Sequence, residues 1–205
     1  MMTANVQIRS SARLHMGFFD LHGGLGRKFG SIGLSLAEPA LLINAGSAEK
    51  LTITGEPAVP ATVLAKASAI AQQIMTKLDL NAAIALHVSQ YIPEHAGLGS
   101  GTQIALAVGK AISHVYQLDL STRQIAELAD RGRRSGIGVA AFDHGGLLID
   151  GGRAASGAAD AVPPMLARYD FPEEWSILLV FDNTQPGIHG EQEKLGFNQL
   201  PVFSE

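Results

Sequence analysis

Apolar and polar residues alternate between Ile84 and Ile92, near the middle of the chain. A period of two is typical of a half-buried β-strand. Apolar residues then recur at helical spacing from Ile104 to Val115. This stretch therefore predicts a strand, a glycine-rich loop and a helix, in that order.

Other runs predict further strands and helices. Short apolar runs separated by turn residues are typical of antiparallel strands, and they cover Val6–Met16, Ile32–Leu36, Leu41–Ala45 and Leu51–Thr54. Residues 18–30 are expected to form a loop dense in glycine and cations. Pro60 is expected to open a helix that continues to Leu78, and a capping box at Ser121 and Gln124 to start one that ends at Gly132. The mixture predicts an α+β fold.

The loop before the central helix has the features of a phosphate site. Its three glycines adopt dihedral angles that other residues resist, and they let a ligand approach the backbone. Ser100 and Gln103 are expected to form a capping box. The first turn of the helix offers N–H groups and the positive end of its dipole. The predicted phosphate-binding residues are Gly97, Leu98, Gly99, Ser100, Gly101 and Thr102. A tight turn with an ordinary helix cap is the alternative.

Composition limits the classes of function. The chain has 205 residues, enough for one domain and part of another, and 46% of them are hydrophobic. A net charge of −4 without a run of basic residues argues against a nucleic-acid surface. No cysteine is present, which excludes disulfides and thiol nucleophiles. No apolar run approaches the ~20 residues of a membrane span. We expect a cytoplasmic protein that binds small molecules.

The loop resembles a motif of the galactokinase, homoserine kinase, mevalonate kinase and phosphomevalonate kinase superfamily. In these kinases a Pro-x-x-x-Gly-Leu-Gly-Ser-Ser loop wraps the phosphates of ATP. Residues 93–100 match every fixed position, and Gly101 replaces the second serine. A later motif of the kinases, Ser-Gly-x-Asp, supplies the base. This chain has Gly138 where that Asp belongs, and Asp143 is out of register. Glycine cannot accept a proton, so the resemblance implies lost kinase chemistry.

The departure points to a non-kinase branch of the superfamily. Five ordered segments are similar to the β-ribofuranosylaminobenzene 5′-phosphate synthases: residues 11–18, 30–34, 97–103, 135–138 with 151–152, and 187–197. The resemblance implies an N-terminal domain like domain 2 of ribosomal protein S5. It also implies the reaction. The ring carbon of 4-aminobenzoate or 4-hydroxybenzoate attacks C1 of phosphoribosyl diphosphate, and CO₂ and diphosphate leave. This step belongs to tetrahydromethanopterin biosynthesis.

Four residues are the candidate catalytic residues: Arg13, His15, Asp20 and Arg27. Arginine, with Lys28 beside Arg27, suits the 5′-phosphate or the aromatic carboxylate. Asp20 could orient Arg13 or His15 or hold a cation, and Mg²⁺ with the diphosphate is one such cation. Each has a structural alternative: a solvated loop for Arg27, a core histidine for His15, and a plain Asp turn for Asp20. His95 is a further candidate for contact with phosphate.

Three cationic residues stand at the C-terminal end of the predicted helix that starts at Ser121, namely Arg131, Arg133 and Arg134. They are expected mainly to compensate the negative end of its dipole.

The C-terminal part is expected to differ from the rest. Residues 1–170 are predicted to form the substrate and phosphate-binding domain, and 171–205 the start of an incomplete α/β domain. Trp175–Phe181 has the apolar content of a strand that is buried on both faces. Without cover it would promote self-association, and a homodimer is expected. An ATP-dependent small-molecule kinase and a non-catalytic phosphate-binding domain remain as alternative functions.

Overall fold

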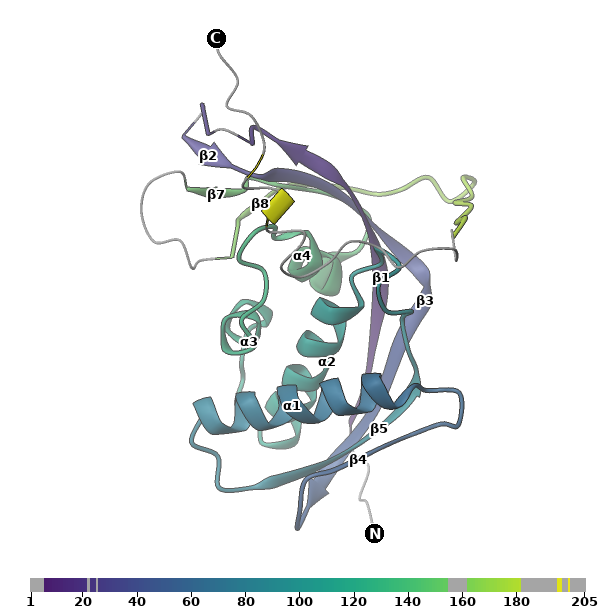
Figure 1. The fold of residues 1–205 in the computed structure, drawn as a ribbon, viewed down its shortest axis with the longest axis vertical. Helices are drawn as coiled ribbons and strands as arrows, with labels where there is room; N and C mark the ends of the chain where they lie inside the picture. The colour runs from purple at the N-terminus through teal and green to yellow at the C-terminus, as the bar shows by residue number, and fades with distance from the viewer. Residues whose placement is uncertain are drawn as a thin grey trace.

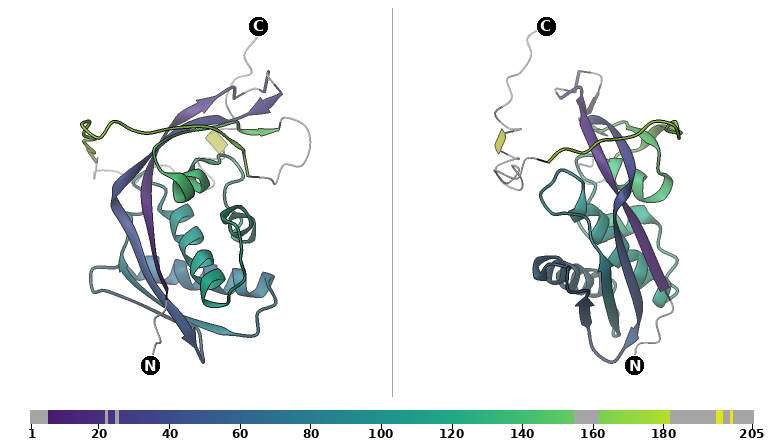
Figure 2. Two further views of the ribbon diagram at one scale, coloured as in Figure 1. Left: turned by 180° about the vertical axis from the view of Figure 1, so that it is seen from behind. Right: turned by 90° about the vertical axis from the view of Figure 1, so that its right-hand side faces the viewer.

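A long two-stranded ribbon is the frame of the fold. The computed structural model describes residues 6–21, 23–24, 26–154, 162–181, 195–196 and 199. Strand β1 (Val6–Phe19) pairs antiparallel with β3 (Gly30–Ala48) along almost its whole length. The two strands curve and twist together (Figure 2), and the helices gather on one side of them (Figure 1).

The second edge of β3 is shared by two strands. Its C-terminal half pairs with β5 (Ala83–Gln90), and its N-terminal half pairs with β6 (Leu147–Asp150). Strand β4 (Thr52–Gly55) extends the sheet beyond β5, and β8 (Met165–Tyr169) extends it beyond β6. Two short strands, β2 (Arg27–Lys28) and β7 (Arg153–Ala154), form a separate pair.

Four helices complete the fold among the described residues: α1 (Ala61–Lys77), α2 (Ser100–Val115), α3 (Thr122–Leu128) and α4 (Ile137–His144). Helix α2 is buried on nearly every side, because it lies between the sheet and helices α1, α3 and α4. Its apolar residues and those of β3, β5 and α1 form the main core. Burying each large apolar side chain contributes about 1.5–3 kcal/mol. This core fixes where α2 begins, next to β1.

The structure confirms the α+β class and the central strand, loop and helix. It also confirms the capping box at Ser121, whose side chain accepts a hydrogen bond from the Gln124 amide. No helix in the described part of the chain is both long and apolar enough to cross a membrane.

Several predicted boundaries are wrong. The two runs around Glu38-Pro39 form one continuous strand, β3. Strand β4 is parallel to β5 rather than antiparallel, because helix α1 carries the chain back to the same edge. Part of residues 18–30, expected as a loop, lies in β1 and β2. Helix α3 ends at Leu128, before Gly132.

The predicted buried strand at Trp175–Phe181 is also wrong. This segment forms no strand, and most of its apolar side chains are exposed, including Trp175 at 64%, Leu178 at 86% and Val180 at 84%. A strand needs a neighbour that supplies hydrogen bonds. The described part of the chain places none beside these residues. Residues 190–200, for which the sequence predicts a loop that leads into a helix, lie almost entirely outside the described residues.

Candidate active site

The glycine-rich loop joins β5 to α2. Gly99 precedes the helix with a left-handed backbone (φ 78°), and Gly97 is also left-handed (φ 75°). The amides of Thr102 and Gln103 both donate to the carbonyl of Gly99. The amides of Ser100 and Gly101 stand at the first turn, where a helix offers no carbonyl acceptor of its own. They and the helix dipole form a seat for an anion.

The capping box predicted at Ser100 is wrong. Ser100 is the first helical residue and makes no capping hydrogen bond. The side chain of Gln103 is fully buried, where it accepts a hydrogen bond from the Ser10 hydroxyl and donates one to the Gly138 carbonyl. Gln103 therefore ties α2 to β1 and α4 instead of capping its own helix.

Arg13 lies over the glycine-rich loop. Its Nη1 donates to the carbonyl of Gly97 at 2.8 Å, and its backbone amide donates to the carbonyl of Leu98 at 3.1 Å. A Cβ atom at Gly99 would lie only 2.8 Å from the Arg13 guanidinium carbon. Strand β1 thus places a cation directly beside the predicted anion seat.

A cavity of about 390 Å³ opens at this place. All six predicted phosphate-binding residues line it, with Arg13 and His95. Two further cations line it, Lys66 and Arg131, which the sequence did not indicate as site residues. Arg131 lies just beyond the end of α3, where its backbone amide donates to the carbonyl of Ala126. Its Nε is buried and has no hydrogen-bond partner among the described residues.

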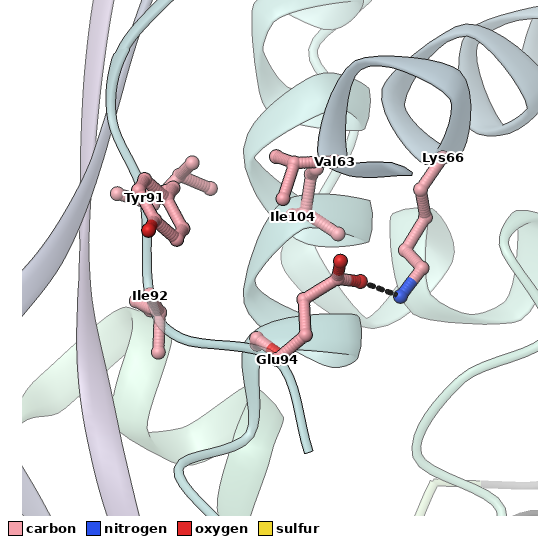
Figure 3. A pocket seen from close by; sticks show the side chains of 8 residues that line it. Val63, Lys66, Tyr91, Ile92, Glu94 and Ile104 are labelled. Atoms are coloured by element: carbon pink, nitrogen blue, oxygen red, sulfur yellow. Dashed lines mark hydrogen bonds and ion pairs between the residues drawn. The ribbon is translucent and has the colours of Figure 1, made fainter. Parts of the chain in front are cut away.

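Lys66 is held by an acidic neighbour. Its Nζ donates to Glu94 (Figure 3). The other carboxylate oxygen of Glu94 accepts from the Thr62 hydroxyl at 2.6 Å. Burial raises the pKa of Glu94, but the hydrogen bonds from Lys66 and Thr62 and the Lys66 charge outweigh it and lower the pKa below its ordinary value. Beside this pair lies a small apolar pocket of about 10 Å³, which has room for about one water molecule.

His15 reaches a different part of the same face. It stands two residues after Arg13 on β1, in unbroken register with β3, so both side chains point to the same side of the sheet. Its Nε2 lies 3.3 Å from the hydroxyl oxygen of Ser135, and its ring packs against Phe18 at 4.6 Å between centroids. The sequence pattern did not indicate Ser135 as a site residue.

Asp20 lies in the turn that follows β1, and Arg27 lies in β2. Neither residue lines the cavity. The Asp20 carboxylate accepts from the amides of Gly23 and Gly24, as expected for the Asp-turn alternative. Arg27 donates to the carbonyls of Gly151 and Gly152 at 2.6 and 2.5 Å. Both side chains therefore bind backbone groups of the protein. Their contact with a substrate stays a prediction.

At Gly138, where the kinases carry their catalytic Asp, the structure leaves no room for a side chain. A Cβ atom at Gly138 would lie 2.8 Å from the methyl carbon of Thr102. Asp143 accepts a hydrogen bond from Thr122 on α3. Among the described residues, no group of three His, Asp or Glu side chains could hold a metal ion.

Comparison with known proteins agrees with this geometry. Residues 62–146, which include the loop and α4, match the N-terminal domain of the GHMP kinases. Mevalonate kinase of Methanococcus jannaschii has the same fold, with a TM-score of 0.56 at 15% identity over 76% of this chain and 57% of that one. The chain therefore has the fold of the GHMP kinases, and the family match includes its glycine-rich loop.

Two archaeal relatives match nearly the whole chain. The chain is 42% identical to a β-ribofuranosylphenol 5′-phosphate synthase of Archaeoglobus fulgidus over 92% of its own length and 60% of that protein. It is 30% identical to a synthase of the same name from Methanothermobacter thermautotrophicus over 94% and 62%. The chain is thus similar over nearly its whole length to synthases of this name. It spans about 60% of the length of these relatives.

Proposed function

We propose that this protein transfers a phosphoribosyl group from 5-phosphoribosyl diphosphate to the ring carbon of a 4-substituted benzoate, releasing CO₂ and diphosphate, as a step of tetrahydromethanopterin biosynthesis. The observation that carries the proposal is the pairing of the Arg13 guanidinium with the open helix start at Gly99. Arginine and oriented amides suit a leaving diphosphate, whose charge grows as the ribosyl bond breaks.

Either benzoate suits the chemistry, because amino and hydroxy groups are both strong ring activators. The relatives' names carry a phenol product, which favours 4-hydroxybenzoate over 4-aminobenzoate. In this proposal Arg131 and Lys66 add charge at the diphosphate, and His15 lies beside the ribosyl group. Arg27 and Lys28 are proposed for the 5′-phosphate or the benzoate carboxylate, Asp20 orients their loop, and Mg²⁺ accompanies the diphosphate.

The proposal includes the organisation of the protein. Residues 1–170 form the domain that binds phosphate and substrate, and residues 171–205 begin a second domain that covers it. The end of the sheet supports this boundary. Strand β8 ends at Tyr169, and residues 170–181 form no strand. A cytoplasmic homodimer is the proposed assembly.

An assay with carboxyl-labelled benzoate tests the function. The chain is incubated with phosphoribosyl diphosphate and labelled 4-hydroxybenzoate or 4-aminobenzoate, and released CO₂ is counted. Arg13→Ala should lose at least ten-fold in kcat/KM, because it removes a charge-assisted contact with the diphosphate. Arg9→Ala is the matched control. Arg9 lies on the same strand but is exposed and paired with Glu38.

The two alternative functions, a kinase and a phosphate-binding domain, predict different results under the same conditions. ATP turnover with phosphorylation of a small alcohol would identify a kinase instead. Calorimetric binding of diphosphate without CO₂ release, in this chain and in one extended to the length of its relatives, would leave a phosphate-binding domain.

A further inference from the structure

The end of helix α3 is clamped to helix α1, which lies beside it (Figure 1). The carbonyl of Leu128, the last residue of α3, accepts hydrogen bonds from Gln73 Nε2 at 2.9 Å and from Lys77 Nζ at 2.8 Å. The same two groups donate to Oδ2 of Asp130, at 2.8 and 2.9 Å. Four hydrogen bonds from α1 therefore hold the chain just before Arg131.

The clamp changes the explanation for the arginine that follows α3. The last turn of a helix carries unpaired carbonyls and a partial negative charge, which nearby cations stabilise. At α3 the ammonium group of Lys77 does this from the neighbouring helix. The backbone amide of Arg131 donates to the carbonyl of Ala126 at 2.7 Å. The side chain of Arg131 is therefore not required at the end of the helix.

The Arg131 side chain lines the anion cavity instead, with a charge that no acid there balances. The described residues that line this cavity include no carboxylate, and no ion pair of Arg131 is found in the described part of the chain. The carboxylate of Asp130 is already shared by Lys77 and Arg133. The Arg131 Nε is buried without an acceptor. Such a group is costly to keep, and an anion in the cavity would offset the cost.

Helix α1 sets the place of two cations at once. Lys66, Gln73 and Lys77 are seven and four residues apart, a spacing that puts all three on one face of the helix. Lys66 lines the cavity itself. Gln73 and Lys77 hold the loop that brings Arg131 to the same cavity. One rigid helix therefore positions Lys66 directly and Arg131 through the clamp.

We propose that Asp130, held by Gln73 and Lys77, is a positioning residue that fixes the Arg131 guanidinium at the cavity, where Arg131 binds the diphosphate group of the substrate. The identity of this anion rests on the proposed function. A guanidinium group can bind phosphate oxygens with two parallel hydrogen bonds. A guanidinium that is fixed in advance needs no reorganisation while negative charge grows on the leaving diphosphate.

Calorimetry with inorganic diphosphate tests the anion contact. Arg131→Ala should lower the affinity by about ten-fold or more, because it removes charge-assisted hydrogen bonds. Arg123→Ala is the control and should leave the affinity unchanged. Arg123 also lies on the α3 side of the molecule, but it is about half exposed and pairs with Glu127. An unchanged affinity in Arg131→Ala would overturn the proposal.

Asp130→Gly tests the clamp. The backbone of Asp130 is left-handed (φ 55°), so glycine keeps its conformation and only the carboxylate is lost. Exposed ion pairs contribute little to stability. The melting temperature should therefore stay near that of the parent, while the affinity for diphosphate falls by about three- to ten-fold. Asp119→Gly, at another exposed left-handed aspartate (φ 47°), is the matched control.

A double-mutant cycle distinguishes positioning from a general structural effect. If Asp130 acts through Arg131, Asp130→Gly should cause no further loss of affinity once Arg131→Ala is present. Asp130→Asn, which keeps an acceptor oxygen, should recover part of the loss seen in Asp130→Gly. Additive losses of affinity in the cycle would contradict the positioning role.

Nuclear magnetic resonance tests the fixed guanidinium without any ligand. In the ¹⁵N-labelled chain, the Nε–H signal of Arg131 is identified by its loss in Arg131→Lys. This proton should exchange slowly with water, because the Arg131 Nε is buried. Asp130→Gly should accelerate the exchange, and Asp119→Gly should not. An Arg131 signal that exchanges as fast in the parent as in Asp130→Gly would count against the clamp.

CO₂ release separates this proposal from the proposed function. A chain that binds diphosphate through Arg131 but releases no CO₂ supports the positioning and counts against the transfer. CO₂ release at the parent rate by Arg131→Ala, with unchanged affinity for diphosphate, supports the transfer and overturns the role of Arg131. A parent chain without measurable affinity for diphosphate also overturns that role.

Discussion

The guanidinium of Arg13 occupies the space that a side chain at Gly99 would fill, with 2.8 Å between the guanidinium carbon and an ideal Cβ position. The same guanidinium donates to the carbonyl of Gly97. The loop and the cation of β1 therefore fit together only because residue 99 has no side chain. This contact joins an element of the sheet to the start of α2, and it concentrates positive charge at one point.

Gly99→Ala should displace Arg13 and weaken diphosphate binding by about ten-fold or more. Part of its effect is backbone strain, since a left-handed non-glycine residue costs about 1–2 kcal/mol. Gly97→Ala is the matched control, because Gly97 is also left-handed but has open space where its Cβ would lie. Both variants should lose similar stability in thermal unfolding. Calorimetry should show the larger loss of affinity for Gly99→Ala, and equal losses would refute the role given to the Arg13 contact.

The glycine-rich loop could be predicted from sequence because its information is local. Three glycines between a strand pattern and a helix pattern fix a turn, and the structure has one there. The absence of a capping box at Ser100 could not be predicted from local sequence. Gln103 has the right spacing, but a buried partner 93 residues away, Ser10, competes for its side chain. Local patterns carry no information about such partners.

The missed site residues share this cause. Lys66 and Arg131 reach the cavity from α1 and from the loop after α3, and nothing in their own neighbourhoods indicates the cavity. The three arginines near the end of α3 were a signal, but compensation of the helix dipole was the preferred explanation for them. Ser135 and Asp150 meet because β6 pairs with β3, a long-range pairing that periodicity does not specify.

Gly138→Asp should not convert the protein into a kinase. The new Cβ would meet the methyl carbon of Thr102 at 2.8 Å, so the side chains must shift, at a cost of about 1–3 kcal/mol. A base must also lie within about 3 Å of the proton it takes. Gly138→Ala is the control for the steric effect and should lower the melting temperature similarly. ATP-dependent phosphorylation by Gly138→Asp, or by the parent chain, would assign the protein to the kinase branch.

Glu94 should contribute to stability that is lost in acid. Although burial raises its pKa, Lys66 and Thr62 lower the folded-state pKa below the ordinary 4.5. A carboxylate with a depressed pKa stabilises the fold above its unfolded pKa, and this contribution disappears as the pH falls through the folded pKa. Unfolding by urea between pH 7 and pH 3 should therefore show a shallower acid loss for Glu94→Gln than for the parent.

Glu38→Gln is the control for that experiment. Glu38 also forms an ion pair, with Arg9, but both side chains are more than half exposed, and such pairs contribute little. Its acid profile should follow that of the parent chain. If Glu94→Gln retained the full acid loss of stability, other carboxylates would be its source.

The segment from Trp175 to Phe181 should make this 205-residue chain self-associate. Its side chains at 175, 178 and 180 are more than 60% exposed, and only Leu179 among its apolar residues packs against the main core. Contiguous exposed apolar surface and unpaired extended backbone favour pairing with another chain. Light scattering should show association that increases with concentration.

A double variant, Leu178→Lys with Val180→Lys, should suppress the association, because two charges in the contact must be desolvated. Ser176→Lys is the control: it adds a charge to the same segment but removes no apolar side chain, and it should leave most of the association intact. Trp175 fluorescence supplies a second measurement, since association should protect its ring from a soluble quencher. A stable monomer at high concentration, with Trp175 already protected, would mean that these residues find their cover within a single chain.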